Sequence, residues 1–163
     1  MPILILTHGY PASGKTTFAE AWQAEDPAGR VIMCRDDIRR EFDVTPGDFK
    51  GESKVTAIHG ERTEKAVDAG LDIIVANTNL VLRDAVRNAR YAHDHGYDIE
   101  VREFRVGQEE LLRRNASRTG VARVPDEVME RMFTNHPYSN WWTREALMDR
   151  LSRPQVVVMP SSR

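Results

Sequence analysis

Short apolar runs alternate with longer amphipathic segments along this chain. Apolar runs of four to six residues are typical of buried strands, and apolar residues at every third or fourth position indicate helices. The pattern predicts strands at 3–7, 31–34, 72–77, 99–104 and 155–159. It predicts helices near 15–25, 36–42, 52–69, 81–95, 108–118, 126–135 and 140–150. The alternation predicts a doubly wound α/β fold whose parallel sheet has helices on both faces.

The length and composition narrow the class of protein. The 163 residues predict a single domain, 1–163, because the Pro/Gly-rich stretch 43–52 is too short to act as a linker. A net charge of −2 gives no general argument for binding nucleic acid. With one cysteine, no basic leader at the N-terminus and no apolar run of membrane-spanning length, we expect a cytoplasmic protein that avoids membranes.

The segment "GYPASGKT" (9–16) fits the phosphate-binding pattern GxxxxGK[ST] between a predicted strand and a predicted helix. Gly9 and Gly14 allow backbone N–H groups to point at one anion. Lys15 would reach the β and γ phosphates of a nucleotide, and Thr16 would offer its hydroxyl to Mg²⁺. The pattern therefore predicts ATP and Mg²⁺ at a P-loop. The expected nucleotide-binding residues are Gly9, Tyr10, Pro11, Ala12, Ser13, Gly14, Lys15, Thr16 and Thr17.

The segment "CRDDIRR" (34–40) lies where the second predicted strand passes into a helix. Asp36 and Arg39 are three residues apart, so their side chains share one face of the first helical turn. Taken alone, Asp36 or Asp37 could be an N-cap. Beside a phosphate loop, its carboxylate suits a general base for an acceptor hydroxyl, and Arg39 suits a bidentate clamp on an acceptor phosphate.

The segment "EELLRRNASRTGVARVP" (109–125) contains several arginines. Glu109 and Glu110 stand four residues before Arg113 and Arg114, so we expect two ion pairs on a helix. Arg118 has no such carboxylate and follows Arg114 by four, a like-charge spacing that favours an anion between them. Arg118 is therefore the arginine expected to reach a transferring phosphate.

A mobile helical lid is expected over about residues 114–125. Such a lid places arginines on the phosphates during transfer, and Arg118, with Arg123 in the loop beyond, would serve that purpose. A solvated surface position is the alternative for both arginines, and it is the favoured interpretation of Arg123.

Two weaker features concern the acceptor. Arg83, Arg87 and Arg90 form one basic stripe that could follow a phosphate backbone, although a solvated helix face is the simpler interpretation. The aromatic residues of "NHPYSNWW" (135–142) could stack on bases, but core packing is favoured, and His8 is interpreted as structural.

Four blocks in this order resemble the kinase domain of phage-type 5′-polynucleotide kinases: "GYPASGKTTFAEAW", "RDDIRREF", "VANTNL" and "RNASRTGVARVPDEVMERM". The resemblance runs from about Ile3 to Met132 and is more specific than the P-loop alone. It implies a P-loop kinase that transfers the ATP γ-phosphate to 5′-hydroxyl ends of DNA or RNA.

The resemblance also implies roles for individual residues. Lys15 and Thr16 would hold the donor phosphates, Asp36 would activate the 5′-hydroxyl, and Arg118 would be the lid arginine on the donor. Arg39 would hold the phosphate on the acceptor's 3′ side. Further acceptor-binding candidates are Asn79, in the "VANTNL" block, and Arg83.

The chain departs from the family in two respects. It has Asn77-Thr78-Asn79 where the family has "DTN", so a role that needs negative charge at Asn77 is lost or moved. It also lacks the C-terminal phosphatase domain of the phage enzyme, so we expect no 3′-phosphatase activity from this polypeptide. The sequence leaves the protein partners unknown; a separate phosphatase and a separate ligase are the candidates.

Two other functions stay open at this point. A P-loop kinase could act on a small acceptor such as a nucleoside, sugar or antibiotic, because the fold and the donor site do not determine the acceptor. The chain could also be a binding module gated by a nucleoside triphosphate, with no phosphoryl transfer; Asn77 is the sequence feature that suggests it.

Overall fold

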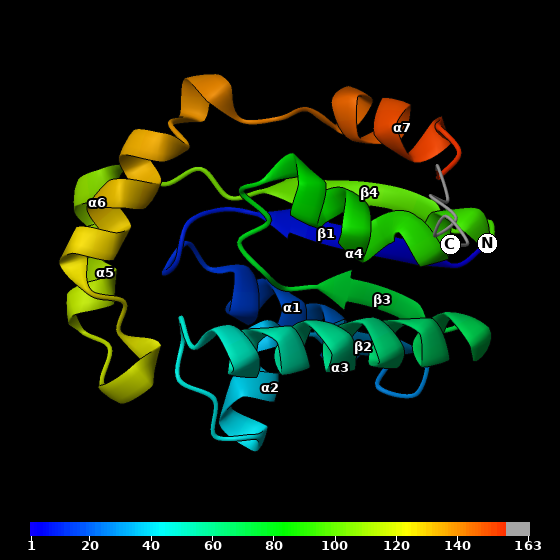
Figure 1. Cartoon of the computed structure of the whole chain (residues 1–163), viewed down its shortest axis with the longest axis horizontal. Coiled ribbons are helices and arrows are strands. Elements are labelled where there is room, and N and C mark those ends of the chain that lie inside the picture. The colour runs from blue at the N-terminus through cyan, green and yellow to red at the C-terminus, as the bar shows by residue number, and fades with distance from the viewer. Residues whose placement is uncertain (156–163) are drawn as a thin grey trace, which may run out of the picture.

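The computed structural model describes residues 1–155, so nearly all of the fifth predicted strand, 155–159, lies outside the described residues. The other four predicted strands form one sheet in the order β2-β3-β1-β4, with every pair parallel. The register places Leu4 of β1 opposite Ile73 of β3 and Ile99 of β4. The four strands are Ile3–His8 (β1), Arg30–Met33 (β2), Asp72–Val75 (β3) and Asp98–Glu103 (β4) (Figure 1).

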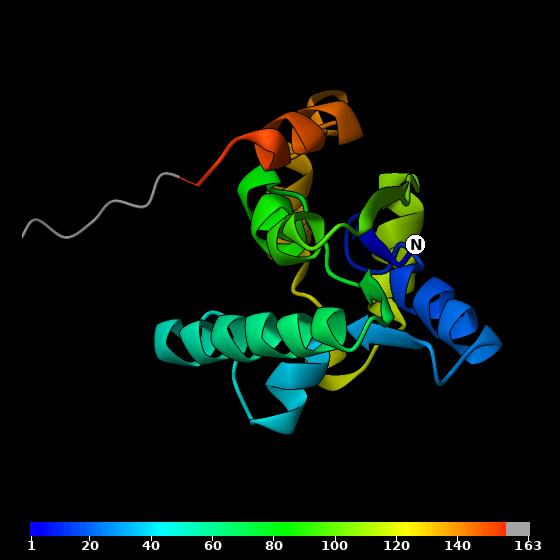
Figure 2. The same cartoon turned by 90° about the vertical axis from the view of Figure 1, so that its right-hand side faces the viewer.

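Helices cover both faces of the sheet, as predicted. Because successive strand residues point to opposite faces, Leu4 and Leu6 pack in one apolar cluster and Ile5 packs in another. The first cluster includes residues of α3, α4 and α7, and the second includes residues of α1. Figure 2 shows α3 and α4 on one side of the strands and α1 on the other. These helices are Lys15–Glu25 (α1), Phe49–Asp68 (α3), Leu82–Asp94 (α4) and Arg144–Ser152 (α7).

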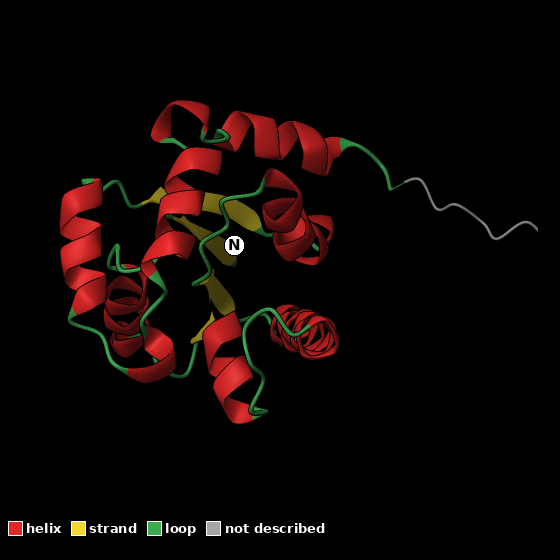
Figure 3. Cartoon of the chain, turned by 60° about the vertical axis from the view of Figure 1, so that its left-hand side comes forward, coloured by secondary structure: helices red, strands yellow, loops and turns green. Residues whose placement is uncertain are grey.

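A third cluster gathers near the carboxyl ends of the strands. It joins Tyr10, which follows β1, to residues of α5 and α6 such as Leu111 and Phe133. These helices therefore stand beyond the strand ends, where ligands bind in open α/β sheets (Figure 1). Figure 3 shows the strands at the centre with helices around them. The remaining elements are Arg35–Glu41 (α2), Gln108–Ala116 (α5), Asp126–Asn135 (α6) and the short 3-10 helices Gly120–Ala122 (η1) and Tyr138–Asn140 (η2). Within residues 1–155, every helix is too short or too polar to cross a membrane.

Some element boundaries differ from the predicted ones. The helix expected from 52 begins at Phe49, because the Asp48 carboxylate accepts the Gly51 N–H at 2.8 Å and caps the helix earlier. The helix expected from 140 begins at Arg144, capped by Thr143. The boundaries of α1 and α6 agree with the predicted ranges 15–25 and 126–135.

His8, the last residue of β1, is buried between two indole rings. Its ring lies 4.1 Å from that of Trp141 and 4.3 Å from that of Trp142, centroid to centroid. Neither ring nitrogen has a hydrogen-bond partner among residues 1–155. Burial lowers the pKa of His8 to about 4, so the ring is neutral at pH 7. The structural interpretation of His8 and the core interpretation of both tryptophans are thus confirmed.

We predict that this histidine makes the fold sensitive to acid. The unfolded chain binds a proton at His8 near pH 6.5, whereas the folded chain does so near pH 4. The contribution of neutral His8 to the free energy of unfolding is therefore complete above about pH 6.5 and is lost as the pH falls to about 4. Over this range the free energy of unfolding falls by up to ~1.4 kcal/mol per pH unit. Urea denaturation across this range should show the loss, and the His8→Phe variant should have a shallower pH dependence. Equal slopes for the two proteins would contradict the prediction.

Candidate active site

The P-loop follows directly from the buried end of β1. Gly14, the N-cap of α1, has a φ of 99°, and Ala12 has a φ of 65°, so the chain turns sharply before the helix. A Cβ on Gly9 would lie 2.9 Å from the Phe104 side chain and 2.8 Å from the Ser13 hydroxyl. Only glycine fits at Gly9, and left-handed backbone at Gly14 favours glycine there. Close packing therefore requires glycine at position 9, and the backbone conformation favours glycine at position 14.

Lys15 is buried, with 8% of its surface exposed, and turns back onto the loop. Its Nζ donates to the Tyr10 carbonyl at 2.5 Å and to the Ser13 hydroxyl at 3.3 Å. No carboxylate of residues 1–155 forms an ion pair with it. Burial, and then the charge of Arg118, lower the pKa of Lys15 to about 7, while the charge of Asp36 opposes the shift. Lys15 thus lies within electrostatic range of both Arg118 and Asp36.

Asp36 lies in the first turn of α2 with 71% of its side chain exposed. The alternative interpretation of Asp36 as an N-cap is wrong, because α2 begins at Arg35 and Cys34 occupies the N-cap position. The carboxylate instead accepts a hydrogen bond from Arg39 Nη1 at 2.5 Å. The base candidate and the clamp candidate are therefore paired with each other.

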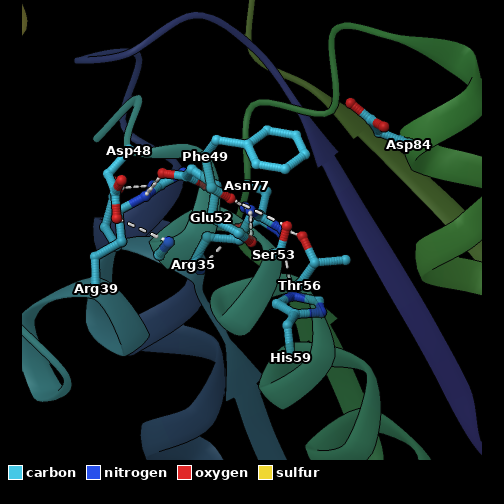
Figure 4. Close-up of polar contacts among 12 residues, drawn as sticks. Arg35, Arg39, Asp48, Phe49, Glu52, Ser53, Thr56, His59, Asn77 and Asp84 are labelled. Carbon is cyan, nitrogen blue, oxygen red and sulfur yellow. Dashed lines mark hydrogen bonds and ion pairs between the residues drawn. The ribbon is translucent and has the colours of Figure 1, made fainter. Parts of the chain in front are cut away.

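Glu52 of α3 holds two arginines of α2, a connection that the sequence analysis missed. Its carboxylate accepts from Arg39 Nε at 2.7 Å, from Arg39 Nη2 at 3.0 Å and from Arg35 Nη2 at 2.7 Å (Figure 4). The bonds from Arg39, and then those from Arg35, lower the pKa of Glu52 to about 2. The sequence contained one indication of this contact. Arg35 and Arg39 are four residues apart on one helix face, where a single carboxylate can pair with both.

Asn77 connects the end of β3 to α2 and α3. Its Oδ1 accepts the Arg35 N–H at 2.9 Å, so this side chain caps α2 in place of Cys34. Its Nδ2 lies 3.1 Å from His59 Nε2. Burial, and then nearby arginine charges, lower the pKa of His59 to about 4, so the neutral ring accepts this bond. A carboxylate at this position could accept the Arg35 N–H but could not donate a hydrogen bond to His59. The Asn77 carboxamide does both, which is a structural reason for asparagine at this position.

Glu110 binds both neighbouring arginines of α5. It accepts from Arg113 at 2.6 and 2.7 Å and from Arg114 at 2.9 Å. The expected pair of Glu109 with Arg113 is wrong, because Arg113 bonds to the carboxylate three residues back rather than four. Arg118 is indeed without a carboxylate among residues 1–155, and its guanidinium donates to the Ala122 carbonyl at 3.3 Å.

Asn115 closes the loop that carries Arg118. Its Nδ2 donates to the Val124 carbonyl at 2.6 Å, and its Oδ1 accepts the Val124 N–H at 3.0 Å. Because α5 ends at Ala116 and not at 118, Arg118 lies on this loop and not on a helix. The expected lid, 114–125, thus corresponds to the end of α5, the loop and η1, held at both ends by one buried asparagine.

Asn79 does not lie open to an acceptor, contrary to the expectation. It is buried, its Nδ2 donates to the Thr7 carbonyl at 2.7 Å, and its Oδ1 accepts from Asn88 at 3.0 Å. This hydrogen bonding occupies the carboxamide and ties the end of β1 to α4.

The basic stripe on α4 divides into three different environments. Arg90 donates to the carbonyls at the end of α7, including that of Leu151 at 2.5 Å, so it joins two helices. Arg87 pairs with Asp84 at 3.1 Å. Arg83 is exposed in the first turn of α4 and has no ion pair within residues 1–155, so it alone keeps a free charge.

Comparisons with known proteins agree with this fold. The AAA_33 model, described as an AAA domain, matches residues 4–137. A chain in the Pnkp1/Rnl/Hen1 RNA repair complex superposes with a TM-score of 0.73 and 25% identity, over 85% of this chain and 45% of that one. A chain in a second Pnkp1/Rnl/Hen1 structure gives 0.61 and 26%, over 69% and 39%. Mycobacterium tuberculosis APS kinase CysC, solved with AMPPNP and APS, gives 0.57 and 14%, over 71% and 69%.

This chain spans less than half the length of the two chains from the Pnkp1/Rnl/Hen1 structures that it matches. The likeness to APS kinase, at 14% identity, shows the fold alone. The family match covers the P-loop, all four strands of the sheet and the Arg118 loop. The chain therefore belongs to the AAA_33 family and has a P-loop kinase domain fold.

Proposed function

We propose that this protein is an ATP-dependent kinase that transfers the γ-phosphoryl group to the 5′-hydroxyl end of DNA or RNA. The observation that carries the proposal is the pairing of Asp36 with Arg39 at 2.5 Å, within electrostatic range of Lys15. It supplies a base for a hydroxyl and a cation for a neighbouring phosphate on one helical turn. The likeness to a chain of the Pnkp1/Rnl/Hen1 RNA repair complex, at 25% identity, supports a nucleic-acid acceptor.

On the donor side, phosphate oxygens would replace the Tyr10 carbonyl as the partner of Lys15. The positive charges of Lys15 and Arg118 repel each other in the free protein, and an anion between them would offset that repulsion. Backbone N–H groups of the P-loop and the N-terminus of α1 add to the attraction for phosphate. These groups are the ones needed to stabilise charge on a transferring phosphoryl group.

Mg²⁺ fits this site as an ion held mainly by phosphate. The Thr16 side chain is exposed in the first turn of α1 and is the candidate protein ligand, whereas the Asn77 oxygen is already bonded to Arg35 N–H. Mg²⁺ commonly takes few protein ligands and keeps several waters. When bound, it would neutralise charge on the donor phosphates.

On the acceptor side, the Asp36–Arg39 pair would open when an acceptor phosphate arrives. Glu52 keeps Nε and Nη2 of Arg39, so the planar guanidinium stays in place and the Asp36 carboxylate would move off Nη1 to make room for the phosphate. The released carboxylate of Asp36 accepts the proton of the 5′-hydroxyl. The 5′-oxygen forms the new bond to the γ-phosphorus as the bond to ADP breaks. Exposed Arg83 is a further candidate for contact with the strand.

The direct test supplies labelled ATP with 5′-hydroxyl oligonucleotides of DNA and of RNA, and in parallel with free nucleosides. Transfer to oligonucleotides supports the proposal. Transfer to nucleosides alone would indicate a small acceptor, and nucleotide binding without transfer would indicate a binding module.

Three expectations from the sequence stay predictions. They are a separate phosphatase and ligase as partners, a cytoplasmic location, and a single domain over 1–163.

The first functional prediction separates the base from the clamp. Asp36→Asn should lower kcat by about 10²–10⁴-fold with little change in nucleotide affinity, because the carboxylate acts on the acceptor. Arg39→Ala should raise KM for acceptors that carry a 3′-phosphate and matter much less for those that lack it. Steady-state kinetics with a nucleoside 3′-monophosphate and the matching nucleoside measure both effects. The same loss with both acceptors would argue against Arg39 as a clamp.

The second compares two arginines of the lid region. Arg118→Ala should lower the transfer rate by roughly 10³-fold or more, because Arg118 has no carboxylate partner and is free to meet the donor phosphates. Arg113→Ala is the matched control and should be nearly silent, since Arg113 is bonded to Glu110 on the surface. Single-turnover rates at saturating ATP give the comparison. Equal effects would leave a general basic patch as the explanation.

The third concerns the pH dependence of nucleotide binding. In the free protein the pKa of Lys15 is about 7, and phosphate raises it. ATP binding above about pH 7 should therefore take up a proton, and Kd should rise by up to about tenfold per pH unit. Calorimetry in buffers of different ionisation enthalpy measures the uptake. The Lys15→Arg variant stays charged and should show none of it. Equal proton uptake by both proteins would exclude Lys15 as its source.

A further inference from the structure

The helix α3 begins with an exposed aromatic side chain. Phe49 is 84% exposed, whereas Phe42, near the end of α2, is 37% exposed with Lys54 lying over its ring at 4.4 Å. Single exposed apolar residues are common on protein surfaces, so exposure by itself indicates no function. The position of Phe49 on α3 is what distinguishes it.

Phe49 shares a face of α3 with the residues that hydrogen-bond to Arg35 and Arg39. Phe49, Glu52 and Thr56 are spaced i, i+3 and i+7, which places them along one stripe of α3. Glu52 bonds to Arg39 and Arg35, and Thr56 accepts from Arg35 Nη1 at 2.9 Å. The stripe therefore faces α2, and Phe49 lies one turn beyond Glu52. Figure 4 shows its ring projecting away from the α3 ribbon, toward the side of the view where Asp84 of α4 is drawn.

The backbone that carries this ring is held firmly. Asp48 caps the helix through the Gly51 N–H, and the Ser53 hydroxyl donates to the Phe49 carbonyl at 3.0 Å. A Cβ on Gly51 would lie 2.5 Å from the Val44 side chain, so the loop before α3 packs closely on its first turn. An aromatic ring on a fixed backbone loses little conformational entropy when a flat ligand stacks on it.

We propose that Phe49 is the stacking platform for the base of the acceptor's terminal nucleotide. This inference rests on the proposed function. With the 5′-hydroxyl at Asp36 and the 3′-phosphate at Arg39, Glu52 links the phosphate site directly to the helix turn that carries Phe49. Every base has a π-face, so such a platform accepts all four nucleotides and favours nucleic acid over acceptors without a flat ring.

The test measures KM and kcat for a 5′-hydroxyl oligonucleotide with three variants. Phe49→Ala and Phe49→Leu should each raise KM by about tenfold or more, because leucine keeps apolar surface but lacks the π-face. Phe49→Trp should keep the wild-type KM. The kcat should change little in all three, since Phe49 contacts neither the hydroxyl nor the donor. The matched control is Phe42→Leu, which should change KM by less than about twofold.

An acceptor whose 5′-terminal nucleotide lacks its base provides the deciding comparison. Wild type and Phe49→Ala should have the same KM for it, because the stacking partner is gone. If wild type phosphorylates oligonucleotides and Phe49→Ala has an unchanged KM, the stacking inference is wrong and the proposed function stands. If wild type phosphorylates no oligonucleotide, both are wrong.

Discussion

The buried positive charge of Lys15 is the constraint around which this site is organised. Moving an ammonium group out of water is costly unless an anion compensates for it, and no carboxylate of residues 1–155 pairs with Lys15. The carbonyl of Tyr10 supplies a dipole in place of a charge. Arg118 adds a second positive charge nearby, which lowers the pKa of Lys15 further. In the proposed function, the donor phosphates would supply the compensating negative charge.

The acceptor side shows the opposite arrangement, because its charges already balance. Glu52 joins Arg35 and Arg39, and Asp36 takes the remaining N–H group of Arg39. A guanidinium held at Nε and Nη2 keeps its plane while Nη1 changes partner. In the proposed function, an acceptor phosphate would meet a preorganised cation, and its binding would release a carboxylate next to the reacting hydroxyl. Binding of the acceptor phosphate to Arg39 would in this way both position the acceptor and free Asp36 to act as the base.

Three asparagines hold this end of the sheet together without adding charge. Asn77 joins β3 to α2, Asn79 joins β1 to α4, and Asn115 closes the Arg118 loop. Each carboxamide donates on one side and accepts on the other, which an aspartate could not do. The departure from the family at Asn77 therefore belongs to a neutral network, in which His59 is also neutral. The carboxylate that acts on the P-loop Lys15 is that of Asp36 in α2.

The sequence by itself determined the element types, the parallel sheet and the P-loop. Those features depend on local periodicity and on residues within one helical turn, which a linear pattern records. Only the tertiary structure decided that Glu52 bonds across to α2, that Asn79 is buried and that Phe49 stands open beside the arginines. Each of these depends on which distant segments the sheet brings together. Burial and hydrogen bonding between such segments follow from packing in three dimensions, which no spacing along the chain encodes.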